Sequence, residues 1–256
     1  MSKPAEKPEI VELPADPPQL APASQRRAAQ QRVREARDRL TSTSGTRPAF
    51  DRELLRQYAE TRISASYVVM LLVVVTGLLL SIWLHPISAG AWTCGLLCIH
   101  AAIVRNCMSF LAEQPSLAET RRWRTRFVLL DLLYGICWMA ALIHPALAAV
   151  SSTLMMFLML LVIAVSSMLA ANLPIAALAT TAPVAIAIAL NLALSGGLDD
   201  YMLAAFALAA EGYFALLAHR LHSTTLATLE ARAEKDALIG ELEQAKAISD
   251  EARYRA

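Results

Sequence analysis

Three charged side chains fall inside long apolar stretches, and they are the residues best placed to do chemistry. Arg105 lies about two helical turns inside the end of the second apolar run, and Asp131 lies about one turn inside the start of the third. A charge within a bilayer is costly, so it usually pairs or marks a functional path. Antiparallel neighbouring spans would bring these two side chains to a similar depth. We therefore expect an Arg105–Asp131 ion pair, joined by Asn106, whose favoured role is to fix the two spans against each other.

The third intramembrane charge, Glu211, lies near the middle of the last apolar run. Asn191, Ser195 and Tyr134 are its expected hydrogen-bond partners, and the sequence leaves the choice among them open. Two interpretations have equal weight. Glu211 either senses a ligand or proton and passes the change along its own helix, or is a neutral carboxyl that holds the bundle together.

Two histidines, His85 and His144, each precede a proline in a short turn between apolar runs. We expect both at the outer surface, where an imidazole can titrate near neutral pH, so they are candidates for pH sensing. A surface histidine before proline is more often a simple turn residue, and that interpretation is favoured.

No complete catalytic or metal-binding motif is recognisable in the sequence. Cys94 and Cys98 share a helix face, but His100 points elsewhere, and a closed zinc site needs about four ligands. Walker, HExxH and GxSxG motifs are absent from the sequence. We therefore expect this chain to contain no catalytic residue and to bind neither a metal nor a cofactor.

The composition predicts an all-α protein with several membrane spans. Of the 256 residues, 56% are hydrophobic and only 18% are charged. The apolar residues are concentrated between positions 63 and 221, in runs close to the roughly 20 residues that a helix needs to cross the hydrocarbon core. We expect six transmembrane helices near residues 63–84, 88–111, 127–143, 146–170, 173–194 and 201–221.

The distribution of positive charge predicts the orientation of these spans. Residues 25–62 contain ten arginines, and the segment Ala112–Arg126 and the tail after Leu221 are also basic. The intervening turns at His85 and His144 have no lysine or arginine. Under the positive-inside rule, this pattern predicts six spans with both termini in the cytoplasm. A five-span alternative, which divides residues 146–194 differently, would put the two charged ends on opposite sides.

The segments that flank the spans have different compositions. Residues 1–24 are proline-rich and predicted to be disordered. Residues 25–62 are predicted to be a cytoplasmic juxtamembrane helical segment, in which Phe50–Arg62 lies at the membrane surface. Its arginines would each favour anionic membrane lipid by roughly 1 kcal/mol. A solvated arm is an equally good interpretation. The net charge of +1 does not suggest a nucleic-acid partner, and none is expected.

Leu203–Ala256 is predicted to be one helix that passes from lipid into water, because it has no proline and little glycine. Between residues 217 and 252, apolar and small residues alternate at spacings of four and three. This pattern is a weak heptad seam, which predicts a parallel coiled coil and a homodimer. We assign residues 63–221 to the membrane domain and 222–256 to a coiled-coil linker.

Two stretches resemble the flanks of the membrane region in alphaproteobacterial sensor histidine kinases, the PleC/DivJ-homologue (PdhS-like) group. They are RLTSTSGTRPAFDRELLRQYAETRISAS (Arg39–Ser66) and EKDALIGELEQAKAISDEARYRA (Glu234–Ala256). The resemblance implies a bacterial inner-membrane protein whose second stretch leads into a kinase core. ATP, Mg²⁺ and a response regulator or phosphotransfer protein would bind only that core. None of the five histidines here matches the phosphoacceptor, so this chain corresponds to the sensor region alone.

The sequence thus predicts the membrane input module of a histidine kinase, which relays a membrane or envelope signal through the sixth span. The alternative is a small transporter-like or ligand-binding membrane protein whose tail only oligomerises it. A transporter would be expected to have broken helices at mid-membrane, and Pro183 and Glu211 are the only hints of these.

Overall fold

The computed structural model describes residues 48–113, 115–144 and 152–255, and every regular element in these ranges is an α-helix. The helices are α2 (Pro48–Ser64), α3 (Ser66–Leu80), α4 (Pro86–Glu113), α5 (Leu117–Leu142), α6 (Ser152–Leu169), α7 (Pro174–Ser195) and α8 (Leu198–Arg255). The predictions for residues 1–24, and for the part of the juxtamembrane segment before Pro48, lie outside the described residues.

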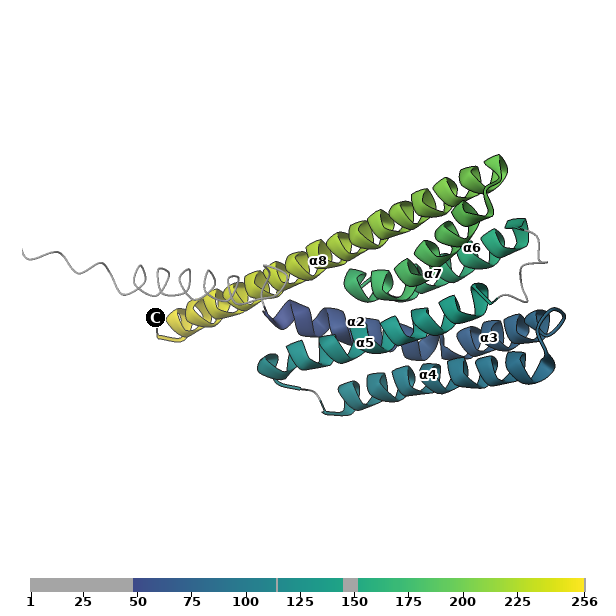
Figure 1. Ribbon diagram of the computed structural model, residues 1–256. Helices are drawn as coiled ribbons and strands as arrows, with labels where there is room; N and C mark the ends of the chain where they lie inside the picture. The colour runs from purple at the N-terminus through teal and green to yellow at the C-terminus, as the bar shows by residue number, and fades with distance from the viewer. Residues whose placement is uncertain (1–47, 114, 145–151, 256) are drawn as a thin grey trace, which may run out of the picture. The chain divides into compact units, whose positions relative to one another are not determined.

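The helices of the unit Pro48–Ala256 form a bundle in which α5 and α7 are central (Figure 1). α5 packs against α4 on one side and α7 on the other, and α7 also contacts α6 and α8. α2 packs against α4 and α5, whereas α3 packs mainly against α4. Large apolar side chains fill the interior, among them Trp138, Phe127, Ile163 and Val184.

The helix ends follow local sequence signals. Pro174 occupies the first turn of α7, where its missing N–H leaves no hydrogen bond unmade. The same helix ends at Gly196, whose φ of 80° is the left-handed conformation that glycine adopts without strain. α5 begins with a capping box in which Ser116 and Glu119 satisfy each other's backbone N–H groups. The boundary predicted between the fourth and fifth apolar runs, at 146–170 and 173–194, does separate two helices, α6 and α7.

Four helices, α4, α5, α7 and α8, are long and apolar enough to cross a membrane. A fifth candidate is the pair α2 and α3, which meet at a break near Ala65 with a bend of 53°. α6 is apolar but shorter, at Thr153–Leu169. The prediction of an all-α protein with several apolar helices able to span a membrane is confirmed in this form.

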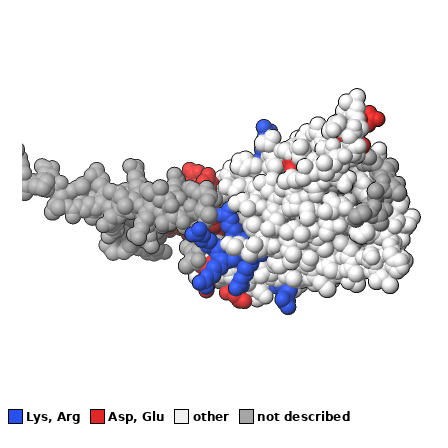
Figure 2. All heavy atoms as spheres, viewed as in Figure 1, with Lys and Arg blue, Asp and Glu red and all other residues white. Residues whose placement is uncertain are grey.

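The outer surface of the bundle is apolar, as expected of helices that face lipid. In α3, Val69 and Val73 are buried, whereas Val68, Leu71 and Leu78 have 64–68% of their surface exposed. A soluble protein would rarely leave so many large apolar side chains in water. Figure 2 shows that the broad flank of the bundle carries few charged atoms, whereas Lys and Arg gather toward one end.

α8 is a single helix of 58 residues. The predicted continuity from the last apolar run into the charged tail is therefore confirmed. Ala204, Ala207 and Ala218 are buried against the bundle, whereas Leu238 and Leu242 have 55% and 70% of their surface exposed. The first half of α8 thus belongs to the bundle, and the second half presents an uncovered row of apolar side chains.

Candidate functional site

α2 carries two large polar side chains into the interior of the bundle. Tyr58 and Arg62 are four residues apart, so they lie on the same helix face, and they have 0% and 2% of their surface exposed. Leu54 and Leu55 continue this buried face. The face packs against α4 and α5, so α2 is part of the bundle. Arg62 in particular is a core residue and does not contact the outside of the bundle.

Both side chains bind Asp131 of α5, which is completely buried. Arg62 Nη2 donates to Asp131 Oδ1 at 2.6 Å, and Tyr58 Oη donates to Asp131 Oδ2 at 2.6 Å. The Arg62 guanidinium also lies over the Tyr58 ring, 5.4 Å from its centroid. A buried carboxylate is stable only when its charge and both oxygens are compensated, and these two residues provide that compensation.

The predicted Arg105–Asp131 pair is wrong, because Arg62 occupies the position expected for Arg105. The buried face of α4 consists of Leu96, His100, Ile103, Cys107 and Phe110. Arg105 lies off this stripe and is exposed. The direction in which a side chain leaves its helix decides its partner, and the prediction did not take that direction into account.

Two adjacent threonines of α7 connect Asp131 to Glu211. Thr180 Oγ1 donates to the backbone oxygen of Asp131 at 3.2 Å, and Thr181 Oγ1 donates to Glu211 Oε1 at 2.7 Å. Consecutive helix residues point about 100° apart, so one turn of α7 reaches both α5 and α8. A polar chain from α2 to α8 results, in which Thr180 and Thr181 are joined only through the backbone of α7. Its members are Tyr58, Arg62, Asp131, Thr180, Thr181 and Glu211.

Glu211 does not have the partners that we predicted. Asn191 is exposed, Ser195 bonds to Asp200 instead, and the hydrogen bond comes from Thr181. Thr181 and Glu211 each lie about four helical turns from the Gly196 turn, so the α7–α8 hairpin places them opposite each other. Glu211 Oε2 is buried and has no hydrogen-bond partner among the described residues.

The remaining sequence candidates lie apart from the polar chain. His85 is exposed, and its Nδ1 accepts a hydrogen bond from the Ile87 backbone N–H at 3.3 Å, as a turn residue would. His144 is exposed just after α5. Neither histidine takes part in the interactions described above for Asp131 and Glu211.

Cys94, Cys98 and His100 do not form a site, because the two cysteines and the histidine lie on different faces of α4. Cys94 and Cys98 are exposed, whereas His100 is buried and its Nε2 lies 3.1 Å from Ser66 Oγ. The expectation that His100 points away from the two cysteines is confirmed. Among the described residues, no three His, Cys, Asp or Glu side chains lie close enough to hold a metal ion.

A second contact holds α8 where it leaves the bundle. His222 Nδ1 lies 3.1 Å from the backbone oxygen of Asn172, in the turn between α6 and α7. Thr225 Oγ1 lies 3.5 Å from Asn172 Oδ1. Beyond this point, most positions of α8 are exposed. Asn172 therefore marks the boundary between the held and the free parts of α8.

Replacing His222 should loosen α8 locally. His222→Ala removes one hydrogen bond worth about 1 kcal/mol, so amide exchange near Thr225 should accelerate about fivefold. Exchange near Ala207 should stay unchanged, because that turn is held by α7. Hydrogen–deuterium exchange with mass spectrometry on the full chain measures both. His219→Ala, an exposed histidine one turn earlier, is the control, and equal acceleration there would contradict the assignment.

The sequence did contain signals for the interactions that we missed. Arg62 continues the apolar stripe of Leu54, Leu55 and Tyr58, and an arginine on an apolar stripe indicates a buried partner. Pairing residues at equal distance from the Gly196 turn would have matched Thr181 with Glu211. The link from Thr180 to Asp131 had no such signal, because α5 and α7 are not consecutive.

The chain has no match among protein-family models, curated proteins or solved structures.

Proposed function

We propose that this protein is the membrane input module of a sensor histidine kinase and that α8 is its output helix. The observation that carries the proposal is the polar chain, which begins on α2 and ends at Glu211 on the helix that leaves the bundle. A change in the bundle that alters the bonding of Glu211 acts on α8 directly, because no break in the helix separates Glu211 from its exposed half.

Glu211 is well suited to be the responsive group of this chain. Only one of its carboxyl oxygens has a hydrogen bond from a described residue, and the other is buried. A buried polar atom without a partner is unfavourable by about 1–3 kcal/mol. A proton, a ligand or a shift of α7 that changes the hydrogen bonding of the Glu211 carboxyl would therefore favour a different position of α8.

The proposed arrangement in the membrane has six spans and both termini in the cytoplasm of a bacterial cell. It counts α2 with α3 as one bent span and α6 as a short one, in addition to the four long helices. The arginines of α2 and of the first turns of α5 support this orientation, because both would lie on the cytoplasmic side. The signal itself would come from the membrane or the envelope.

The proposal includes a homodimer that forms through residues 217–252. Its support is the uncovered row on α8, in which Leu238 and Leu242 are exposed at heptad spacing. Two such helices side by side would cover these side chains. A seam that also contains Thr228 and Lys235 would be weak, and a weak seam allows two packings of similar energy.

The two sequence hints of the transporter alternative, Pro183 and Glu211, do not interrupt their helices, whereas the bend between α2 and α3 lies near Ala65. Transporters commonly bind their substrate where a span is interrupted near mid-membrane. α7 continues through Pro183 as one helix, and α8 continues through Glu211. We therefore retain the sensor as the single proposal.

The coding DNA that follows codon 256 tests the kinase part of this proposal. If the frame continues into a helix with an H-box histidine and an ATP-binding domain, the chain feeds a kinase core. ATP, Mg²⁺ and the regulator would then act on that core. A stop codon followed by unrelated sequence would argue against a kinase output.

A further inference from the structure

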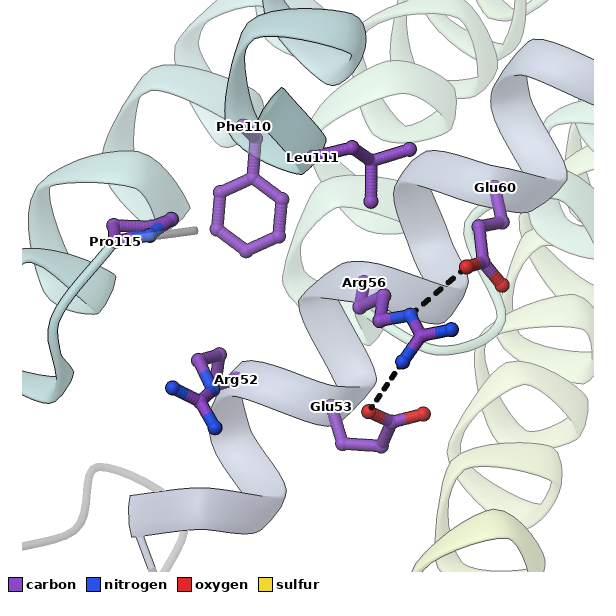
Figure 3. Close-up of a pocket in the computed structure, with 7 residues that line it drawn as sticks. All are labelled: Arg52, Glu53, Arg56, Glu60, Phe110, Leu111 and Pro115. Carbon is purple, nitrogen blue, oxygen red and sulfur yellow. Dashed lines mark hydrogen bonds and ion pairs between the residues drawn. The ribbon is translucent and has the colours of Figure 1, made fainter. Parts of the chain in front are cut away.

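A cavity of about 430 Å³ opens between α2, α4 and the α4–α5 connection. Its polar wall is one face of α2, with Arg52, Glu53, Arg56 and Glu60, and its opposite wall consists of Phe110, Leu111 and Pro115 (Figure 3). This volume falls in the range of small-molecule sites in proteins. A ligand that fits it needs a charged part and an apolar part.

The charged wall has two arginines and two glutamates and is neutral overall, but its charges are paired unevenly. Arg56 is held between two carboxylates, with Nε 2.9 Å from Glu60 Oε1 and Nη1 3.8 Å from Glu53 Oε2. Arg52 has no ion pair with any other described residue, and Figure 3 shows its side chain on the side of α2 that faces Pro115 and Phe110. A guanidinium in this position is suited to bind a phosphate through two parallel hydrogen bonds.

The apolar wall is rigid. Phe110 has 3% of its surface exposed, and its ring packs edge-on against Trp123 with 5.5 Å between centroids. Arg126 in turn covers Trp123, with 4.9 Å between its guanidinium carbon and the ring centroid. Leu111 and the exposed Met108 continue the apolar surface of α4 away from the cavity. An acyl chain could therefore leave the cavity along α4.

In the membrane arrangement proposed above, the cavity lies at the level of the lipid headgroups. It is at the end of the bundle where Lys and Arg gather, beside the first turns of α5 with the exposed Arg121 and Arg122 (Figure 2). The cavity therefore meets both the charged and the apolar parts of a membrane lipid at the correct depth. A soluble phosphate would use only the Arg52 side of it.

From these observations we propose that the α2–α4 cavity binds the phosphate headgroup of an anionic phospholipid of the phosphatidylglycerol type. Arg52 binds the phosphate, and the partly exposed Leu111 contacts the glycerol and the first acyl carbons, whereas Phe110 is buried beneath this surface. The site goes beyond the proposed sensor function and rests only on the membrane placement. Tyr58 and Arg62 lie on the same helix, so bound lipid would stabilise the end of α2 that holds Asp131.

Competitive lipid retention tests this site on the full-length chain. The purified protein in detergent is mixed with equimolar phosphatidylglycerol and phosphatidylcholine, and retained lipids are counted by native mass spectrometry. Wild type should retain phosphatidylglycerol preferentially, and Arg52→Gln should reduce that preference about tenfold. Both lipids have a phosphate that can accept hydrogen bonds, but only phosphatidylglycerol has a net negative charge that the lost positive charge would attract. Arg121→Gln, an exposed arginine at the same end but outside the cavity, should retain the wild-type preference.

Each remaining outcome overturns the proposal in a defined way. Equal losses in Arg52→Gln and Arg121→Gln would show only a general attraction of the basic end. Displacement of the lipid by millimolar inorganic phosphate would show a site for soluble phosphate. Equal retention of phosphatidylcholine would show no selectivity for an anionic headgroup. Lipid retention involves no kinase output, so failure here leaves the sensor proposal intact.

Discussion

Arg62→Leu should destabilise the protein by about 3–5 kcal/mol, because it leaves the carboxylate of Asp131 buried without its cation. Asp131 has 0% of its surface exposed, so water cannot replace the guanidinium. Only the Tyr58 hydroxyl would still bond to the carboxylate. The free energy of unfolding of the full chain in mixed detergent micelles measures the effect.

Two further variants separate loss of charge pairing from loss of packing. Arg105→Leu is the matched control, because Arg105 is exposed on α4, and it should not destabilise the protein, since a lipid-facing charge is costly rather than stabilising. The double variant Arg62→Leu/Asp131→Leu should be more stable than Arg62→Leu alone, because it removes the unpaired charge. If Arg62→Leu and Arg105→Leu were equally stable, Arg62 would not be the partner of Asp131.

Gly135→Ala should destabilise the protein by about 1–3 kcal/mol, the usual cost of overpacking a filled interior. A Cβ atom at position 135 would overlap the backbone carbonyl of Thr180 on α7. Backbone atoms cannot rotate away, so α5 and α7 would have to separate. That movement would also lengthen the hydrogen bond from Thr180 to the Asp131 backbone oxygen.

Two other glycines provide a graded comparison under the same unfolding conditions. At Gly77 the added Cβ would meet the hydroxyl of Thr93, a side chain that can turn aside, so Gly77→Ala should have a smaller effect. At Gly95 it would meet nothing within 4 Å, and Gly95→Ala should be neutral or stabilising by up to about 1 kcal/mol. A variant at Gly135 as stable as one at Gly95 would contradict the close packing of α5 and α7.

The class of fold follows from the sequence because hydropathy and helix breakers are local properties. Pro174 and Gly196 bound α7 in the sequence as they do in the structure, and the absence of proline after Leu203 correctly predicts the long α8. The residues that face lipid and those that face the core are harder to separate. Lipid and core are both apolar, so a membrane helix such as α3 has no polar face to mark its exposed side.

The candidate site was predicted only in part, for a related reason. Asp131 and Glu211 are recognisable because a charge in an apolar run is costly wherever its partner lies. Their partners depend on which helices are neighbours and on how each is rotated about its axis. Arg62 replaces Arg105, and Thr181 replaces the expected partners of Glu211, because the packing of α2 and α7 is set by contacts between segments far apart in the chain.

A disulfide scan along the exposed half of α8 can detect whether the state of Glu211 is transmitted to that half. The four native cysteines are replaced by alanine, and single cysteines are introduced into the full chain in native membranes. We expect several-fold more cross-linking at Leu238 and Leu242, which lie on the seam, than at Ala237 and Gly240, which do not. Glu211→Gln should change the ratio between the two seam positions, whereas Tyr213→Phe, at an exposed site in the same turn, should leave it unchanged. Equal cross-linking at all four positions would exclude the seam, and an unchanged ratio in Glu211→Gln would exclude transmission from Glu211.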